Sequence, residues 1–151
     1  MRNIKWVFAC LSIILLTASF SSAQTAHPLD QFGDVNCEDE MAHLDNFAIE
    51  IQSNPGSIGY VSVYGGNYGR RGEAKARASR IKEYLVKSRG LDSNRVMTID
   101  SGYMEHLTVE LWLLPRAVSA PPITPTIQPK DVKFKKGKIK RSEYRQCGLG
   151  F

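Results

Sequence analysis

The chain has 151 residues, of which 42% are hydrophobic, and a formal net charge of +5. This length bounds it to one small domain with a single core. Residues 24–115 carry nine Lys or Arg and thirteen Asp or Glu, a net charge of −4, whereas residues 116–151 carry nine and two, a net charge of +7. The basic character therefore belongs to a C-terminal segment. Such a segment either favours anionic partners or is kept soluble by its own charge.

The first 23 residues have the pattern of a secretory signal peptide. Arg2 and Lys5 precede an apolar run over residues 6–20, and small residues follow at 21–23. The run is shorter than the roughly 20 residues that a membrane span needs. We expect cleavage after residue 23 and a periplasmic or secreted protein. An uncleaved anchor is one less favoured alternative. Lipidation at Cys10 is another, because Cys10 lies near the start of the apolar run and not after it.

Cysteine usage agrees with export. Once Cys10 is removed with the leader, Cys37 and Cys147 are left as an even pair in an oxidising compartment. A disulfide between them would close a loop of about 110 residues, nominally worth about 4 to 5 kcal/mol, and would attach the basic tail to the start of the first helix. Two cysteines so far apart in the sequence could equally stay unpaired.

The first predicted elements are a strand over residues 29–32 and a helix that follows it. Asp34 or Asn36 caps this helix, and acidic residues at 38–40 suit its positive first turn. Its apolar face recurs at spacings of three and four, and residues 53–56 end it. Residues 58–64 are β-branched and aromatic, which predicts a strand.

A glycine-rich loop at residues 65–72 separates this strand from a second helix, predicted over residues 73–88 and closed by Gly90. A strand at 95–100, a turn at 101–106 and a strongly apolar strand at 107–114 follow. The last two strands are expected to form a hairpin. The order predicts an α/β (α+β) two-layer sandwich, β-α-β-α-β-β, with both helices on one face of a mixed sheet.

Beyond residue 115 the composition changes. Residues 116–130 are rich in proline and predict an extended linker near polyproline II. Residues 131–151 form a basic tail in which apolar and basic residues alternate over 132–140. This alternation fits either an edge strand or disorder.

The second helix and the last strand carry a resemblance to a known family. Residues 77–85 read Arg-Ala-Ser-Arg-Ile-Lys-Glu-Tyr-Leu, residues 89–96 read Arg-Gly-Leu-Asp-Ser-Asn-Arg-Val, and residues 109–111 read Val-Glu-Leu. In this pattern and in the order of its elements, the chain resembles the C-terminal domain of outer membrane protein A and its relatives over about 85 residues. The resemblance implies a periplasmic β-α-β-α-β-β module that binds peptidoglycan.

The chain departs from the family pattern at the ligand. The family binds diaminopimelate with an Asp just after the second strand and with the helical Arg. Arg77 matches that Arg, but Gly65 or Gly66 stands at the Asp position, and the loop is several residues shorter. The resemblance therefore implies the fold more directly than the ligand.

The glycine-rich loop is the candidate binding site. Backbone amides gather around anions where a loop enters a helix, and arginine holds a carboxylate through two parallel hydrogen bonds. The alternative is that the glycines only permit a tight, solvated connection. The candidate ligand-binding residues are Tyr64, Gly66, Asn67, Arg70, Arg71 and Arg77.

The tail is a second candidate contact. Basic residues with apolar residues between them suit an anionic membrane surface or wall polymer. Nucleic acid would fit the charge, but the export signal argues against it. The candidate contacts are Lys133, Lys135, Lys136, Lys138, Lys140 and Arg141.

Catalysis has little support in the sequence. Nothing places His27, His43 or His106 beside a cysteine or serine as a nucleophile–base pair, and two ligands on one helix do not complete a zinc site. We expect no cofactor and no enzyme. The prediction is a non-catalytic exported envelope module that binds peptidoglycan or another anionic envelope polymer or lipid. The alternative is the same fold without wall binding, serving as a protein–protein interaction domain.

Overall fold

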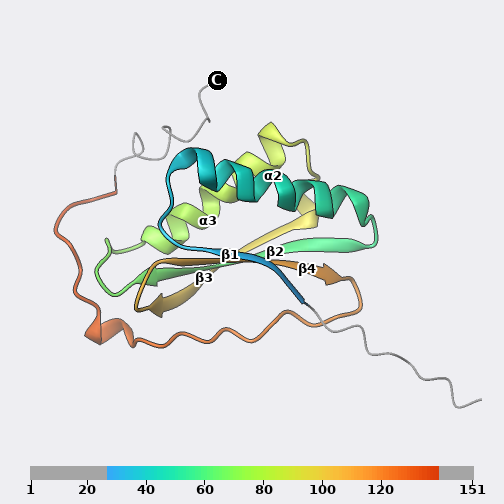
Figure 1. The fold of residues 1–151 in the computed structure, drawn as a ribbon. Helices are drawn as coiled ribbons and strands as arrows, with labels where there is room; N and C mark the ends of the chain where they lie inside the picture. The colour runs from blue at the N-terminus through green and yellow to red at the C-terminus, as the bar shows by residue number, and fades with distance from the viewer. Residues whose placement is uncertain (1–26, 140–151) are drawn as a thin grey trace, which may run out of the picture.

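The computed structural model describes residues 27–139 and confirms the predicted fold class (Figure 1). Two helices lie on one face of a mixed four-stranded sheet. The predicted signal peptide lies outside the described residues. Between residues 27 and 139 no helix has the length and apolar character of a membrane span. The elements are β1 (His27–Phe32), α2 (Cys37–Ser53), β2 (Ser57–Gly66), α3 (Glu73–Glu83), β3 (Val96–Met104) and β4 (Thr108–Pro115).

The sheet has the strand order β1-β4-β2-β3. β2 and β3 are parallel, and β4 is antiparallel to both of its neighbours, β1 and β2. The predicted hairpin between the last two strands is therefore wrong. The predicted turn at 101–106 is also too long, because β3 continues to Met104. β4 is buried on both faces, through Leu111 and Leu114 for example, which suits an interior strand, whereas Met97 of β3 is 50% exposed at the sheet edge.

Helix α2 begins where the sequence predicts. The Asn36 side chain accepts a hydrogen bond from the Asp39 N–H at 3.0 Å and caps the helix. The helix packs closely on β2 at Gly59, where a Cβ atom would collide with Ile51 and Phe47. Burial of its apolar face against the sheet is the main stabilising term for this layer. The core residues of the helix are Leu44, Phe47, Ala48 and Ile51.

The predicted second helix consists of two parts. α3 ends at Glu83, and the chain continues as a π-helical turn, Tyr84–Ser88, before Gly90 at φ +68° reverses it. The Tyr84 hydroxyl donates to Asp45 of α2 at 2.6 Å and accepts from Arg89 at 2.7 Å, and Arg89 also pairs with Asp45. The π turn therefore places Tyr84 and Arg89 where they join the two helices.

Residues 116–130, predicted as a linker, run along the face of the sheet opposite the helices; we call this segment the strap (Figure 1). The N–H of Thr124 donates to the Tyr64 hydroxyl at 3.4 Å, and the N–H of Ile127 donates to the Tyr103 carbonyl at 3.1 Å. Pro125 lies against Gly102, which has φ +90°. The strap contributes to covering the residues that this face buries, which include Tyr60, Ser62, Tyr64 and Leu114.

Candidate functional site

Arg77, the residue matched to the family's ligand-binding arginine, lies in a buried ion cluster. Its side chain is 9% exposed and donates to Glu40 at 3.0 Å and to Asp34 at 3.2 Å. Arg80 donates to the same Glu40 carboxylate at 2.6 and 2.7 Å. Glu40, only 1% exposed as a residue, thus neutralises part of the positive charge of α3 from within the chain. The sequence did not reveal this, because Glu40 resembles the other acidic residues of the first helical turn.

The other predicted loop residues do not converge on a single anion site. Tyr64 is 1% exposed and contacts the strap. Arg71 is exposed, with its guanidinium 4.4 Å from the centroid of the Phe134 ring. The backbone N–H of Arg70 donates to the Glu73 carboxylate at 3.1 Å, so an acidic side chain already lies at the N-terminus of α3. Gly66 has its Cα against the backbone of Leu107, where a Cβ would come within 3.0 Å, and it does line a pocket.

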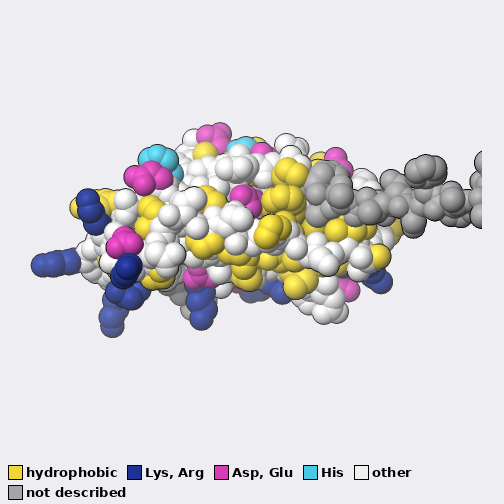
Figure 2. Space-filling model, turned by 90° about the horizontal axis from the view of Figure 1, so that it is seen from below, with side chains coloured by type: hydrophobic (Ala, Val, Ile, Leu, Met, Phe, Trp, Pro, Cys, Tyr) yellow, Lys and Arg dark blue, Asp and Glu magenta, His cyan; other side chains and the backbone are white. Residues whose placement is uncertain are grey.

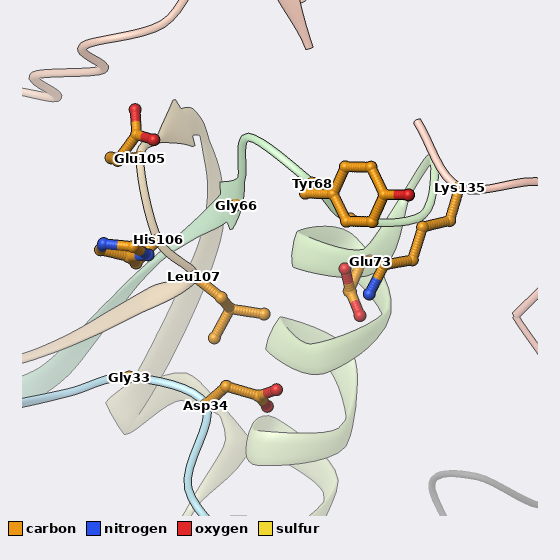
Figure 3. Close-up of a pocket in the computed structure, with 10 residues that line it drawn as sticks. Gly33, Asp34, Gly66, Tyr68, Glu73, Glu105, His106, Leu107 and Lys135 are labelled. Atoms are coloured by element: carbon orange, nitrogen blue, oxygen red, sulfur yellow. The ribbon is translucent and has the colours of Figure 1, made fainter. Parts of the chain in front are cut away.

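That pocket, of about 390 Å³, lies between the glycine-rich loop, the β3–β4 turn and the segment that follows β1 (Figure 3). In Figure 3, the Leu107 side chain points into it, while Asp34, Glu73 and Lys135 bring charged groups to it from three separate segments. Its lining residues are Gly33, Asp34, Gly66, Tyr68, Gly69, Glu73, Glu105, His106, Leu107 and Lys135.

The basic tail completes one wall of the pocket. The N–H of Lys133 donates to the Asn67 carbonyl, and the N–H of Lys135 donates to the Gly69 carbonyl, both at 2.9 Å. Phe134, between them, packs edge-on against Tyr103 with ring centroids 5.7 Å apart. These contacts bind residues 133–135 to the loop without forming the edge strand that the alternation allowed. The Lys135 ammonium lies 5.0 Å from the centroid of the Tyr68 ring.

The pocket contains charges of both signs. The Asp34 side chain is 83% exposed although one of its oxygens accepts from Arg77, so its carboxylate stays accessible. Glu73 uses one oxygen for the Arg70 N–H. The sequence offers Asp34 as a possible helix cap and gives no sign of a binding role for Glu73. Asp34, Glu73 and Lys135 line one pocket because contacts form between segments that are far apart in the chain.

The remaining predicted residues have separate places. His43 pairs with Asp30 and stacks on Phe32 at 4.5 Å, and His106 lies in the β3–β4 turn beside the pocket. Within residues 27–139 no group of three or more His, Cys, Asp or Glu side chains could hold a metal ion. Lys136 and Lys138 are exposed, whereas Lys140 and Arg141 lie outside the described residues.

Cys37 is disulfide-bonded. The chain's other two cysteines, Cys10 and Cys147, both lie outside the described residues. The pairing of Cys37 with Cys147 therefore stays a prediction.

Comparisons with known proteins assign no family and no function to this pocket. No protein-family model matches the chain, and no curated protein does.

Proposed function

We propose that this domain is a non-catalytic module of the cell envelope whose pocket holds the α-amino acid group of a diamino acid in the peptidoglycan stem peptide. The observation that carries the proposal is the convergence of Asp34, Glu73 and Lys135 on one cavity at the loop end of the sheet. The fold, which agrees with the one that the family resemblance implies, supports the same class of protein.

The chemistry of the pocket fits a group that carries both an ammonium and a carboxylate. The carboxylates of Asp34 and Glu73 accept hydrogen bonds from the ligand ammonium, and Lys135 pairs with the ligand carboxylate. Leu107 offers an apolar contact for the ligand methylenes. A volume of about 390 Å³ falls within the range of small-ligand sites.

Arg77 has a different role in this proposal from the one that the resemblance implies. Its guanidinium is paired with Glu40 and does not line the pocket. It also donates to Asp34 at 3.2 Å. Arg77 is therefore a positioning residue that holds the Asp34 carboxylate at the edge of the cavity.

The test is a titration with a stem tripeptide that contains diaminopimelate, compared with the same tripeptide carrying lysine, which lacks the second carboxylate. We expect amide NMR shifts at Gly66, Glu73 and Lys135, and weaker binding of the lysine peptide. Glu73→Gln keeps the hydrogen bond to the Arg70 N–H and removes the charge, so we expect affinity to fall about tenfold or more. Glu50→Gln, on the exposed side of α2, is the matched control.

A second candidate is a protein-interaction domain that kept this fold and lost wall binding. The pairing of Arg77 with Glu40 favours it, because that guanidinium is already engaged by a carboxylate of the chain. Equal affinity for the two tripeptides, or no shift around the pocket with either, would overturn the wall-binding proposal in favour of this one.

A further inference from the structure

The end of the molecule that carries the pocket also presents a set of exposed cations, which we call the basic rim. Lys and Arg side chains gather at one end of the molecule in Figure 2, the end where the loop and the tail lie in Figure 1. The rim belongs to two segments, the glycine-rich loop and the tail that is hydrogen-bonded to it. Its exposed members are Arg71, Lys133, Lys135, Lys136 and Lys138.

The charge of the rim is not neutralised from within residues 27–139. None of its five cations forms an ion pair with a carboxylate of this range. Several cations elsewhere do have internal partners: Arg77 is paired with Glu40, Arg89 with Asp45, and Arg95 donates to backbone carbonyls. The positive potential at the rim is therefore directed at the solvent.

The rim is held in place and carries apolar groups among its charges. Backbone hydrogen bonds from Lys133 and Lys135 fix the tail on the loop, and Phe134 anchors it against Tyr103 and Arg71. The ring of Tyr68 is 66% exposed beside Lys135. A fixed basic surface with an exposed aromatic ring suits the boundary between lipid head groups and acyl chains.

We propose that the basic rim docks on an anionic phospholipid bilayer. The lysines are drawn to the lipid phosphates, and Tyr68 enters the head-group layer. Each lysine held near such a surface strengthens binding by about fivefold at moderate ionic strength. A soluble phosphate polymer would bind the same cations, but Tyr68 would add little to its affinity. The contribution of Tyr68 to binding therefore distinguishes a bilayer from a soluble phosphate polymer.

The experiment is co-sedimentation of the full chain with phosphatidylcholine vesicles that contain about 30% phosphatidylglycerol or none. The test variant combines Lys133→Gln, Lys136→Gln and Lys138→Gln. Lys135 is kept, so that the pocket is unchanged and failure here is distinct from failure of peptide binding. The matched control removes three lysines of α3 and the π turn with Lys75→Gln, Lys82→Gln and Lys87→Gln. Residues 1–26 are the same in every variant, so their contribution cancels.

We expect the rim variant to bind anionic vesicles about a hundredfold more weakly than the unmodified chain, and the control less than fivefold. Binding by the unmodified chain should also fall steeply when salt rises above about 0.1 M. Tyr68→Ser should weaken binding several-fold with an unchanged salt dependence. Equal losses for the rim variant and its control would overturn the proposal. An unchanged affinity of Tyr68→Ser would also overturn it, in favour of a soluble phosphate polymer.

Discussion

The buried carboxylate of Glu40 tests how the two helices are held together. Its side chain is 2% exposed, and those of Arg77 and Arg80 are each 9% exposed. Glu40→Gln keeps the shape of the side chain and removes its charge. Two buried guanidinium groups would then lose the carboxylate that they share. Removing one partner of a buried ion pair costs about 3–5 kcal/mol of the free energy of unfolding.

Removing one arginine should cost less than removing the shared carboxylate. In Arg77→Met, Glu40 remains paired with Arg80, and the solvent-exposed Asp34 is rehydrated. The free energy of unfolding then falls only by the contribution of the charge-assisted hydrogen bonds of Arg77, about 1–3 kcal/mol. The double variant Glu40→Gln/Arg77→Met should lose less than the sum of the two single losses, because the second change removes one of the two cations that Glu40 neutralises.

Urea unfolding followed by far-UV circular dichroism measures these free energies. Glu50→Gln, an exposed change on the same helix, serves as control and should stay within about 0.5 kcal/mol of the unmodified chain. A loss for Glu40→Gln that is smaller than the loss for Arg77→Met would refute the argument that Glu40 is the neutralising centre of the cluster.

Three further predictions concern other parts of the fold. Burial, and then the hydrogen bond to Asp45, raise the pKa of Tyr84 above its usual value of 10.0. The stability that this hydroxyl contributes is therefore complete below pH 10 and is lost as the pH rises further. Urea midpoints measured against pH should show this loss, and Tyr84→Phe should abolish it. Gly59→Ala pushes a Cβ into the packed face of α2 and should destabilise the domain by about 1–3 kcal/mol in the same urea assay. An unchanged urea unfolding curve would contradict this prediction. Non-reducing peptide mapping should link Cys37 to Cys147, and reduction should lower the unfolding free energy by about 4 kcal/mol; a link to Cys10 would contradict the pairing.

The fold class could be predicted because its signals are local. The three- and four-residue spacing of Leu44, Phe47 and Ile51 predicts α2, and the capping of that helix by Asn36 is one of the two options that the sequence offered. Strand order is not a local property. A short turn between two apolar strands favours a hairpin, whereas the burial of β4 on both faces places it between β1 and β2.

The candidate site was harder to predict for the same reason. Its charged residues, Asp34, Glu73 and Lys135, come from three segments that only tertiary packing brings together. Gly66 of the predicted loop lines the pocket. Arginine residues near the loop suggested an anion site. The sequence held no signal that the Arg77 guanidinium would pair with Glu40, which lies 37 residues earlier in the chain on α2.

The position of β4 in the sheet also determines when this chain is able to fold. Among residues 27–139, β1 forms a ladder with β4 alone, so the first strand of this range lacks a strand partner until its last strand has been synthesised. Pairing across so long a stretch of sequence is slow, because the ends of a large loop must first meet. The export that we predict from residues 1–23 would benefit from such a delay, because the chain would still be unfolded during translocation.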